Sequence, residues 1–247
     1  MEKISSRKNK YILHLRNLSN DSEYRKQSNE FLCDGYKLLE EAIKSGAKIT
    51  SILYKEEPGK IPSVERQFCA SADVFDFASP MKNSPGPLFT CEIRKKTQAD
   101  RCKKVIVLEN VQDPGNVGTV IRTANAFDID AVILVGSCAD IYNPKTSRAT
   151  MGAIFRQNIL TMNLDELQDF LKRNSLKLYG AALSDRAEDI RNISIKECAV
   201  AVGSEGHGLS REFLSICDCE IIIPMKPCTE SLNASVAASV VMWEMWR

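Results

Sequence analysis

Hydrophobic and polar positions alternate in two different ways along the chain, and the change falls near residue 100. After it, short apolar runs are separated by stretches with helical periodicity, which is typical of a layered α/β domain with a mostly parallel sheet. The predicted strands are 105–108, 131–135, 176–182, 199–202 and 220–223. The predicted helices are 119–127, 164–173, 210–217 and 231–246. We therefore predict an α/β fold for this part of the chain.

Before residue 100 the pattern indicates a smaller alternation of helices and strands. A helix is predicted over 30–47, because its apolar residues share one face and Gly46 is a natural stop. That face consists of Phe31, Leu38, Leu39, Ala42 and Ile43. Strands are predicted at 49–54, 74–77 and 88–93, with a short helix at 64–69 and a turn-rich segment at 79–87.

A polar stretch without periodicity separates the two patterns. Residues 94–104 carry six basic residues against Asp100, and such a stretch is a natural linker. We predict a first domain over 1–95, a basic linker over 96–104 and a second domain over 105–247.

Composition narrows the class of protein. The chain has 247 residues, 44% of them hydrophobic and 26% charged, as in ordinary soluble globular proteins. A net charge of +1 means that a nucleic-acid surface would have to be a local patch. The beginning of the chain has charges where a signal peptide needs its apolar core, and no apolar run is long enough to span a membrane. We expect a cytoplasmic protein.

Cysteine and histidine usage argues against a metal site. The nine cysteines are scattered, and no C-x-x-C pair indicates zinc or a redox motif. We expect reduced, mostly buried thiols. Only His14 and His207 are present, which disfavours a histidine-based metal site or a Ser-His-Asp triad.

The first sixteen residues are basic. They contain one carboxylate, Glu2, and five basic residues: Lys3, Arg7, Lys8, Lys10 and Arg16. Two interpretations stay open, a solvated basic arm and an arm that contacts phosphates.

Three loops in the second part carry candidate chemistry. The first spans 109–127, where Gly115 and Gly118 permit a tight turn between a strand and a helix. It matches neither the dinucleotide fingerprint nor a P-loop. Asn116 stands at the mouth of the predicted helix and Arg122 lies further along it, where a surface salt bridge is the alternative role.

The second loop, 203–210, has three glycines at the carboxyl end of a strand, where open α/β sheets bind ligands. The alternative is a plain tight turn, with Glu205 solvated and His207 a surface histidine. The third loop follows the apolar run 221–223 and Pro224, and the helix after it is capped by Glu230 or Ser231.

The three loops are predicted to bring polar groups to one edge of a sheet, as an active site requires. The residues are Asn116, Arg122, Glu205, Ser231 and Asn233. None is a strong nucleophile, so the set suits positioning and electrostatic stabilisation.

These loops resemble the three motifs of the SpoU/TrmH branch of the SPOUT RNA methyltransferases. The motifs read N-x-x-D-P-G-N-x-G-x-x-x-R-T-A-x-A-F at 110–127, G-S-E-G-x-G-L-S at 203–210 and I-P-M-x-x-x-x-E-S-L-N-x-S-V-A at 223–237. The phrase F-L-C-D-G-Y-K-L-L-E-E-A at 31–42 is similar to the opening of the family's L30e-like substrate-binding domain. The resemblance covers nearly the whole chain.

The resemblance implies transfer of a methyl group from S-adenosylmethionine to a ribose 2′-hydroxyl of RNA. It also implies a C-terminal α/β-knot domain with a deep trefoil knot, which is an exception to the usual rules of topology, and a homodimer through that domain. The backbone around Gly203, Gly208, Ile223, Met225 and Leu232 would hold the methyl donor. The five polar residues would line the reacting site.

The chemistry fits those roles. A ribose hydroxyl is a weak nucleophile, so the enzyme must stabilise a developing alkoxide and align it. Guanidinium is effectively always protonated, so Arg122 would act as a fixed positive charge, with an RNA phosphate or water accepting the proton. Asn116 would orient the ribose or Arg122, and Glu205 would hold Arg122. Ser231 and Asn233 would bind the RNA phosphate and shape the donor loop.

One position departs from the family pattern, since Pro227 stands where glycine is frequent and alters the expected loop shape. The expected substrate is ribosomal (23S) RNA, with transfer RNA as the alternative. A non-catalytic RNA-binding protein that keeps the fold is the competing interpretation from another class. A generic nucleotide-binding enzyme is disfavoured by the missing fingerprint glycines.

Overall fold

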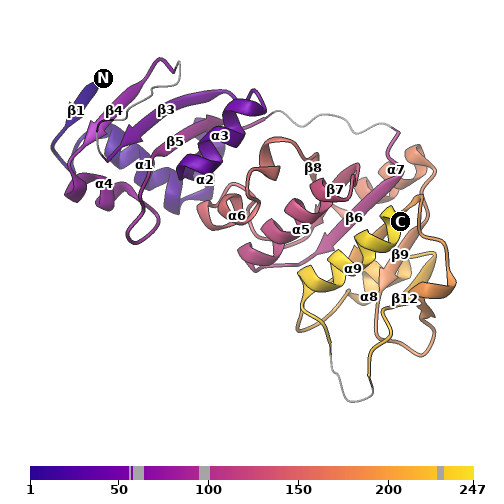
Figure 1. Ribbon diagram of the computed structural model, residues 1–247. Helices are drawn as coiled ribbons and strands as arrows, with labels where there is room; N and C mark the ends of the chain where they lie inside the picture. Colours follow the sequence, from indigo (N-terminus) through magenta and orange to yellow (C-terminus); the bar gives the residue numbers. More distant parts are fainter. Residues whose placement is uncertain (56, 58–63, 95–100, 227–230) are drawn as a thin grey trace. The chain divides into compact units, whose positions relative to one another are not determined.

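The structure is a computed structural model that describes residues 1–55, 57, 64–94, 101–226 and 231–247 (Figure 1). Contacts divide the chain into two compact units. The first unit contains Met1–Lys95 and Asp140–Phe155, and the second contains Lys96–Ala139 and Arg156–Arg247. None of the described helices combines the length and the hydropathy that crossing a bilayer requires.

The second unit is built on a sheet of seven parallel strands. In sheet order they are β10 (Glu188–Asp189), β12 (Cys219–Ile222), β9 (Leu178–Ala181), β11 (Cys198–Val202), β6 (Lys104–Glu109), β7 (Ala131–Val135) and β8 (Ile159–Met162). All residues of β7 and β11 are buried, as expected for central strands covered on both faces. The predicted α/β fold with a parallel sheet is confirmed, whereas the short edge strands β8 and β10 were not predicted from the sequence.

Helices follow the strands. They are α5 (Pro114–Ala126), α7 (Leu164–Asn174), α8 (Arg211–Ser215) and α9 (Ala234–Trp246), with a short 3₁₀ turn, η2 (Ile190–Asn192). Helix α5 begins five residues before the predicted start, because Asp113 caps it and Pro114 occupies its first turn. Helix α9 begins at Ala234, because Asn233 is its N-cap. The prediction that Glu230 or Ser231 caps this helix is therefore wrong.

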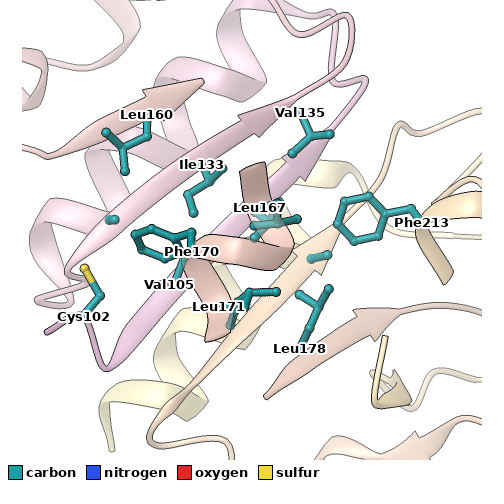
Figure 2. Packing of buried hydrophobic residues seen from close by; sticks show 14 of the residues in the cluster. Cys102, Val105, Ile133, Val135, Leu160, Leu167, Phe170, Leu171, Leu178 and Phe213 are labelled. Carbon is teal, nitrogen blue, oxygen red and sulfur yellow. The ribbon is translucent and has the colours of Figure 1, made fainter. Parts of the chain in front are cut away.

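The core of the second unit lies between α7 and the sheet. Leu167, Phe170 and Leu171 of α7 pack against strand residues such as Val105 and Ile133 (Figure 2). Burying a side chain of this size contributes about 1.5–3 kcal/mol. This packing fixes the sheet as a rigid frame for the loops at its edges.

The first unit contains a mixed sheet of five strands. In sheet order they are β1 (Glu2–Ile4), β4 (Gln67–Ala70), β3 (Ile49–Tyr54), β5 (Leu88–Glu92) and β2 (Glu30–Asp34). The helices are α1 (Lys10–Asn20), α2 (Ser22–Ser28), α3 (Tyr36–Lys44), α4 (Ala72–Ala78) and α6 (Pro144–Ala149), with the 3₁₀ turn η1 (Ala153–Phe155). Strands β1, β4 and β3 are parallel, and β5 is antiparallel to both β3 and β2.

Several predictions for the first unit are wrong. The predicted helix 30–47 is a strand, β2, followed by α3, because three consecutive buried residues pair with β5 and Gly35 has a φ of 110°. That φ is incompatible with a continuous helix and suits glycine. The predicted helix 64–69 is strand β4, which pairs with β3 on one side and β1 on the other.

The predicted strand at 74–77 lies within α4, where Val74, Phe75 and Ala78 turn inward at helical spacing. The basic first segment is folded, since Ile4 is buried in the sheet and α1 buries Ile12 among other apolar residues, while its basic side chains at positions 3, 7, 8 and 10 stay exposed. In both places packing in the tertiary structure decided a conformation that local composition did not indicate.

The segment 140–155 joins the first unit through contacts that the sequence did not predict. Arg25 is 3% exposed and donates from Nε to Asp140 Oδ2 at 3.0 Å and from Nη1 to the Leu18 carbonyl at 2.6 Å. Phe31 packs on Tyr142 with ring centroids 4.8 Å apart. Breaking a buried ion pair of this kind is strongly destabilising, so the segment is held firmly.

Candidate functional site

Four neighbouring strands of the parallel sheet end at one edge, and the loops after them gather there. Strands β12, β9, β11 and β6 are adjacent. A cavity of about 510 Å³ opens where the loops after β9, β11 and β12 meet the start of α9. Its lining includes all five residues predicted to hold a methyl donor: Gly203, Gly208, Ile223, Met225 and Leu232. A volume of this size is typical of small-molecule sites.

The loop after β11 requires glycine at two positions. A Cβ on Gly203 would lie 2.1 Å from the carbonyl carbon of Gly208, so no side chain fits there. Gly208 has a φ of 65° and its N–H donates to the Ser204 carbonyl at 2.8 Å. The loop therefore folds back on itself, with the backbone of Gly203 packed directly against that of Gly208.

Three of the predicted site residues form one hydrogen-bonded cluster. Asn116 Nδ2 donates to Glu205 Oε1 at 2.6 Å, and Asn233 Nδ2 donates to the same carboxylate oxygen and to Asn116 Oδ1 at 3.1 Å. These side chains are separated by as many as 117 residues along the chain. The structure thus brings together the polar groups of all three predicted loops.

Helix ends support this cluster. Asn116 lies in the first turn of α5, and Asn233 is the N-cap of α9, where its Oδ1 accepts from Ser235 N at 3.0 Å and from Val236 N at 3.3 Å. The N-terminus of a helix favours nearby negative charge. The Glu205 carboxylate, which is bonded to both residues, is therefore held by two amides next to two positive helix ends.

Ser231 lines the cavity, as does Glu205. Arg122 is exposed on α5, and it has no hydrogen bond or ion pair with any residue that the structure describes. The structure shows no contact between Glu205 and Arg122 within one chain; the two amides both bond Glu205 Oε1. Pro227 and Glu230 lie outside the described residues.

The sequence analysis missed Glu109. This residue ends β6 and is 5% exposed. Its two carboxylate oxygens accept from Ser210 Oγ at 2.6 Å and from Ser210 N at 2.7 Å. A carboxylate at the end of a buried apolar strand is the sequence signal that could have indicated this role. Glu109 fixes the end of the glycine loop to the central strand.

Thiols beside the cavity are unreactive. Burial, with added repulsion from Asp218 and Glu220, raises the pKa of Cys217 to about 12. A thiol with this pKa is protonated at neutral pH and is a poor nucleophile. Among the residues that the structure describes, no three His, Cys, Asp or Glu side chains gather into a metal site. The described groups therefore suit binding and charge stabilisation.

The cavity suits an adenosyl ligand with a sulfonium centre. Gly208 leaves the space of its missing Cβ open, and Ile222, Ile223 and Leu232 offer apolar contacts. The Glu205 carboxylate provides negative charge near a cation. The described lining thus fits S-adenosylmethionine in shape and charge.

Comparisons with known proteins agree with this geometry. The pattern of the SpoU rRNA Methylase family matches residues 103–243, and that of the MRM3-like substrate binding domain matches residues 9–81. The chain is 33% identical over 248 residues to a relative from Bacillus subtilis (strain 168), with 99% of both chains covered. That relative is named 23S rRNA (guanosine(2553)-2'-O)-methyltransferase RlmP.

Two solved structures have the same fold. An AdoMet-bound rRNA methyltransferase from Sinorhizobium meliloti superposes with a TM-score of 0.86 at 24% identity, covering 99% of this chain and 97% of that one. The SpoU methyltransferase AviRb from Streptomyces viridochromogenes, in complex with AdoMet, gives 0.87 at 22% identity, covering 97% and 98%. With the glycine loop, the polar cluster and the family pattern in agreement, this chain belongs to the SpoU rRNA methylase family.

Proposed function

We propose that this protein transfers the methyl group of S-adenosylmethionine to a ribose 2′-hydroxyl in 23S ribosomal RNA. The observation that carries the proposal is the cluster of Asn116, Glu205 and Asn233 beside the cavity after β11 and β12. The Bacillus subtilis relative is named a 23S rRNA methyltransferase, and the match covers 99% of both chains. This similarity supports 23S RNA as the substrate.

The donor supplies an activated methyl group on a positively charged sulfur. We propose that Gly203, Gly208, Ile223, Met225 and Leu232 hold it. Glycine backbone and apolar side chains bind the adenosine without competing for the methyl group. A bound donor would displace water from this part of the cavity, which strengthens the electrostatic interactions in it.

The protein's remaining task is to make the ribose hydroxyl a better nucleophile. In our proposal Arg122 places its fixed positive charge beside the developing alkoxide, and an RNA phosphate or water takes the proton. Asn116 and Asn233, held by Glu205, orient the ribose, while Ser231 contacts the RNA phosphate.

We further propose a homodimer through the second unit, whose segment after β12 passes through a loop as a trefoil knot. Helix α9 exposes Val236, Val240, Trp243 and Trp246, each between 38% and 51%. Trp243 and Trp246 extend an aromatic cluster with Phe127, at centroid distances of 5.6 and 6.0 Å. An exposed apolar face of this kind is typical of an interaction site.

Arg122 lies on α5, which packs beside α9 (Figure 1). Because Arg122 reaches no described group of its own chain, we propose that it serves the active site of the second copy. Mixing Arg122→Ala with Asn233→Ala protein tests this arrangement: restored methyl transfer in the mixture supports a shared site, and additive loss contradicts it.

For the first unit we propose an L30e-like RNA-binding role over 1–95, joined by the basic linker 96–104. We also propose that the protein acts in the cytoplasm, because the eight described cysteines are all free thiols. The match of residues 9–81 to the MRM3-like substrate binding domain supports a substrate-binding role for this unit.

The RNA assignment is tested by incubating the protein with labelled donor and total RNA from cells that lack its own gene. Label in 23S RNA is the expected result. Label only in transfer RNA would move the substrate to that class, and donor binding without labelled RNA would favour a non-catalytic RNA-binding protein.

A further inference from the structure

The first unit has a cavity of its own, remote in sequence from the methyl-donor loops. It has a volume of about 710 Å³ and lies where the start of α1 meets β2 and β4. Its lining includes two cations, three carboxylates, a histidine and two aromatic rings: Lys10, Arg66, Glu2, Glu30, Glu65, His14, Tyr11 and Phe68. It combines flat, polar and cationic groups, which are the elements of nucleotide recognition.

One wall of the cavity is flat. Tyr11 and Phe68 stack with ring centroids 4.1 Å apart and an interplanar angle of 28°. The Arg66 guanidinium lies over both rings, with its Cζ 5.8 Å from the Tyr11 centroid and 5.9 Å from the Phe68 centroid. Tyr11 and Phe68 are only 7% and 9% exposed, whereas Arg66 is exposed, so the guanidinium is the part of this wall that a ligand can reach most easily. Bases stack readily on aromatic rings and on guanidinium planes.

A second wall is polar and held in place. The His14 ring is hydrogen-bonded through Nδ1 to the Tyr24 hydroxyl at 2.9 Å and through Nε2 to Glu30 Oε2 at 2.8 Å. Burial raises the pKa of Glu30, but hydrogen bonds from His14 and Thr50 outweigh it and keep the pKa below 4.5. The Glu30 carboxylate is therefore charged at neutral pH. A carboxylate has about four acceptor positions, so it can also accept an N–H from a base edge.

The two cations of the cavity form no direct ion pair with a described residue, although Arg66 lies close enough to Glu30 to help lower the pKa of that carboxylate, and Glu2 and Glu65 also line the cavity. Other basic groups of the same segment are occupied: Lys3 pairs with Glu57, Arg7 pairs with Asp73, and Arg16 donates to the Phe77 carbonyl. By contrast, neither Lys10 nor Arg66 forms an ion pair with a residue in the described part of the chain. These two charges remain available to a phosphate.

We propose that this cavity binds one unpaired nucleotide of an RNA. The base lies against Arg66 and the Tyr11–Phe68 stack, its polar edge faces Glu30, and Lys10 contacts the adjoining phosphate. The assignment to the RNA substrate rests on the proposed function, and it adds a second recognition site that is separate from the reacting one.

The test uses the full chain and a fluorescein-labelled hexaadenylate, r(A)₆, at low salt. Fluorescence anisotropy measures affinity, and ultraviolet crosslinking with mass spectrometry locates the contact. Arg66→Ala should weaken binding about tenfold or more, because one base–side-chain stack is worth about 1–3 kcal/mol. Arg66→Lys should lose several-fold, since it keeps the charge but not the plane. The matched control is Lys26→Ala, an exposed cation on α2 that does not line the cavity.

Crosslinks at Tyr11, His14 or Phe68 that disappear in Arg66→Ala support the proposal. Equal affinity of wild type and Arg66→Ala, or crosslinks confined to other peptides, overturns it. Free AMP is the second ligand: displacement of r(A)₆ by equal concentrations of AMP would identify a mononucleotide site instead of an RNA site.

Methyl transfer to 23S RNA by the same preparations separates the two hypotheses. Normal transfer without crosslinks in the cavity contradicts this inference alone. Crosslinks in the cavity without any methyl transfer contradict the proposed function and leave the RNA site supported.

Discussion

The two sheets of this protein place residues around their cavities in different ways. In the second unit all seven strands are parallel, so the loops that follow four adjacent strands end at one edge. Residues as distant in sequence as Asn116 and Asn233 therefore meet there at hydrogen-bonding distance. In the first unit the sheet is mixed. Its cavity is lined by the start of α1, the start of β2, residues of β4 and the beginning of the chain at β1.

The difference shows what each arrangement is suited to. A parallel sheet gathers many loops around one point, which suits a reaction that needs several groups in fixed positions. The cavity beside the mixed sheet offers a flat wall and two cations that form no direct ion pair with a described residue, which suits recognition of a flexible, charged ligand. Changes at the parallel edge should therefore affect turnover or the donor, and changes in the first unit should affect RNA affinity or local stability.

The largest expected effect is that of Arg122→Ala. Loss of the proposed charge beside the alkoxide should lower turnover roughly 100-fold or more while donor affinity changes little. Turnover is measured with labelled donor and unmodified RNA, and donor affinity by calorimetry. Arg173→Ala, which removes an exposed arginine on α7, should turn over normally. Near-normal turnover of Arg122→Ala would remove this residue from the mechanism.

Gly203→Ala should have the next largest effect. The new Cβ would meet the Gly208 backbone at 2.1 Å, so the loop must move, and donor affinity should fall about tenfold or more, which corresponds to about 1.4 kcal/mol. Gly206→Ala is the matched control in the same loop, since no atom lies within 4 Å of its added Cβ. Equal donor affinity of the two variants would show that this loop does not shape the donor site.

Asn233→Ala should have two smaller effects. Loss of the α9 cap should cost about 1 kcal/mol of unfolding free energy, and loss of the bonds to Asn116 and Glu205 should slow methyl transfer. Asn163→Ala removes the cap of α7 in the same unit without touching the site. Similar thermal shifts for both variants, with slowed transfer only in Asn233→Ala, are expected. Slowed transfer in both would mean that the cluster acts only through stability.

The smallest effect concerns the first unit and its pH dependence. The fold lowers the pKa of Glu30 below its ordinary value, so the folded state binds fewer protons there than the unfolded state. The resulting stability is complete above the pKa of the unfolded chain and is lost as pH falls through the folded pKa. Glu30→Gln lacks this contribution.

The stability advantage of wild type over Glu30→Gln should therefore shrink as pH falls from about 6 to about 3. Amide hydrogen exchange of β2 measures it. Glu40→Gln, an exposed carboxylate on α3, serves as the control and should show no comparable change. A constant difference between wild type and Glu30→Gln would contradict the stabilising role of Glu30.

The sequence predicted the second unit well because its strands are buried on both faces. Continuous apolar runs such as 131–135 have few alternatives, and the observed strand has the predicted bounds. The same parallel arrangement made the meeting of Asn116, Glu205 and Asn233 predictable from loop positions alone. Arg122 forms no described bond with them, because it lies well inside α5, whereas Asn116 stands in the first turn of that helix.

The first unit was harder to predict because partners distant in sequence decide its elements. Residues 67–70 form a strand only because β3 and β1 pair with them. Phe31 shares a helical face with Leu38 in the sequence, yet Gly35 separates a strand from a helix between them. The buried pair of Arg25 and Asp140 joins residues 115 positions apart, and no local pattern indicates such a contact.

The most direct test of the central claim is the chemical position of the transferred methyl group. The protein is incubated with labelled donor and unmodified 23S RNA, and the RNA is digested to nucleosides for mass spectrometry. The account predicts the label on one 2′-O-methyl nucleoside, formed roughly 100-fold more slowly with Arg122→Ala. Label on a base instead of a ribose would contradict it.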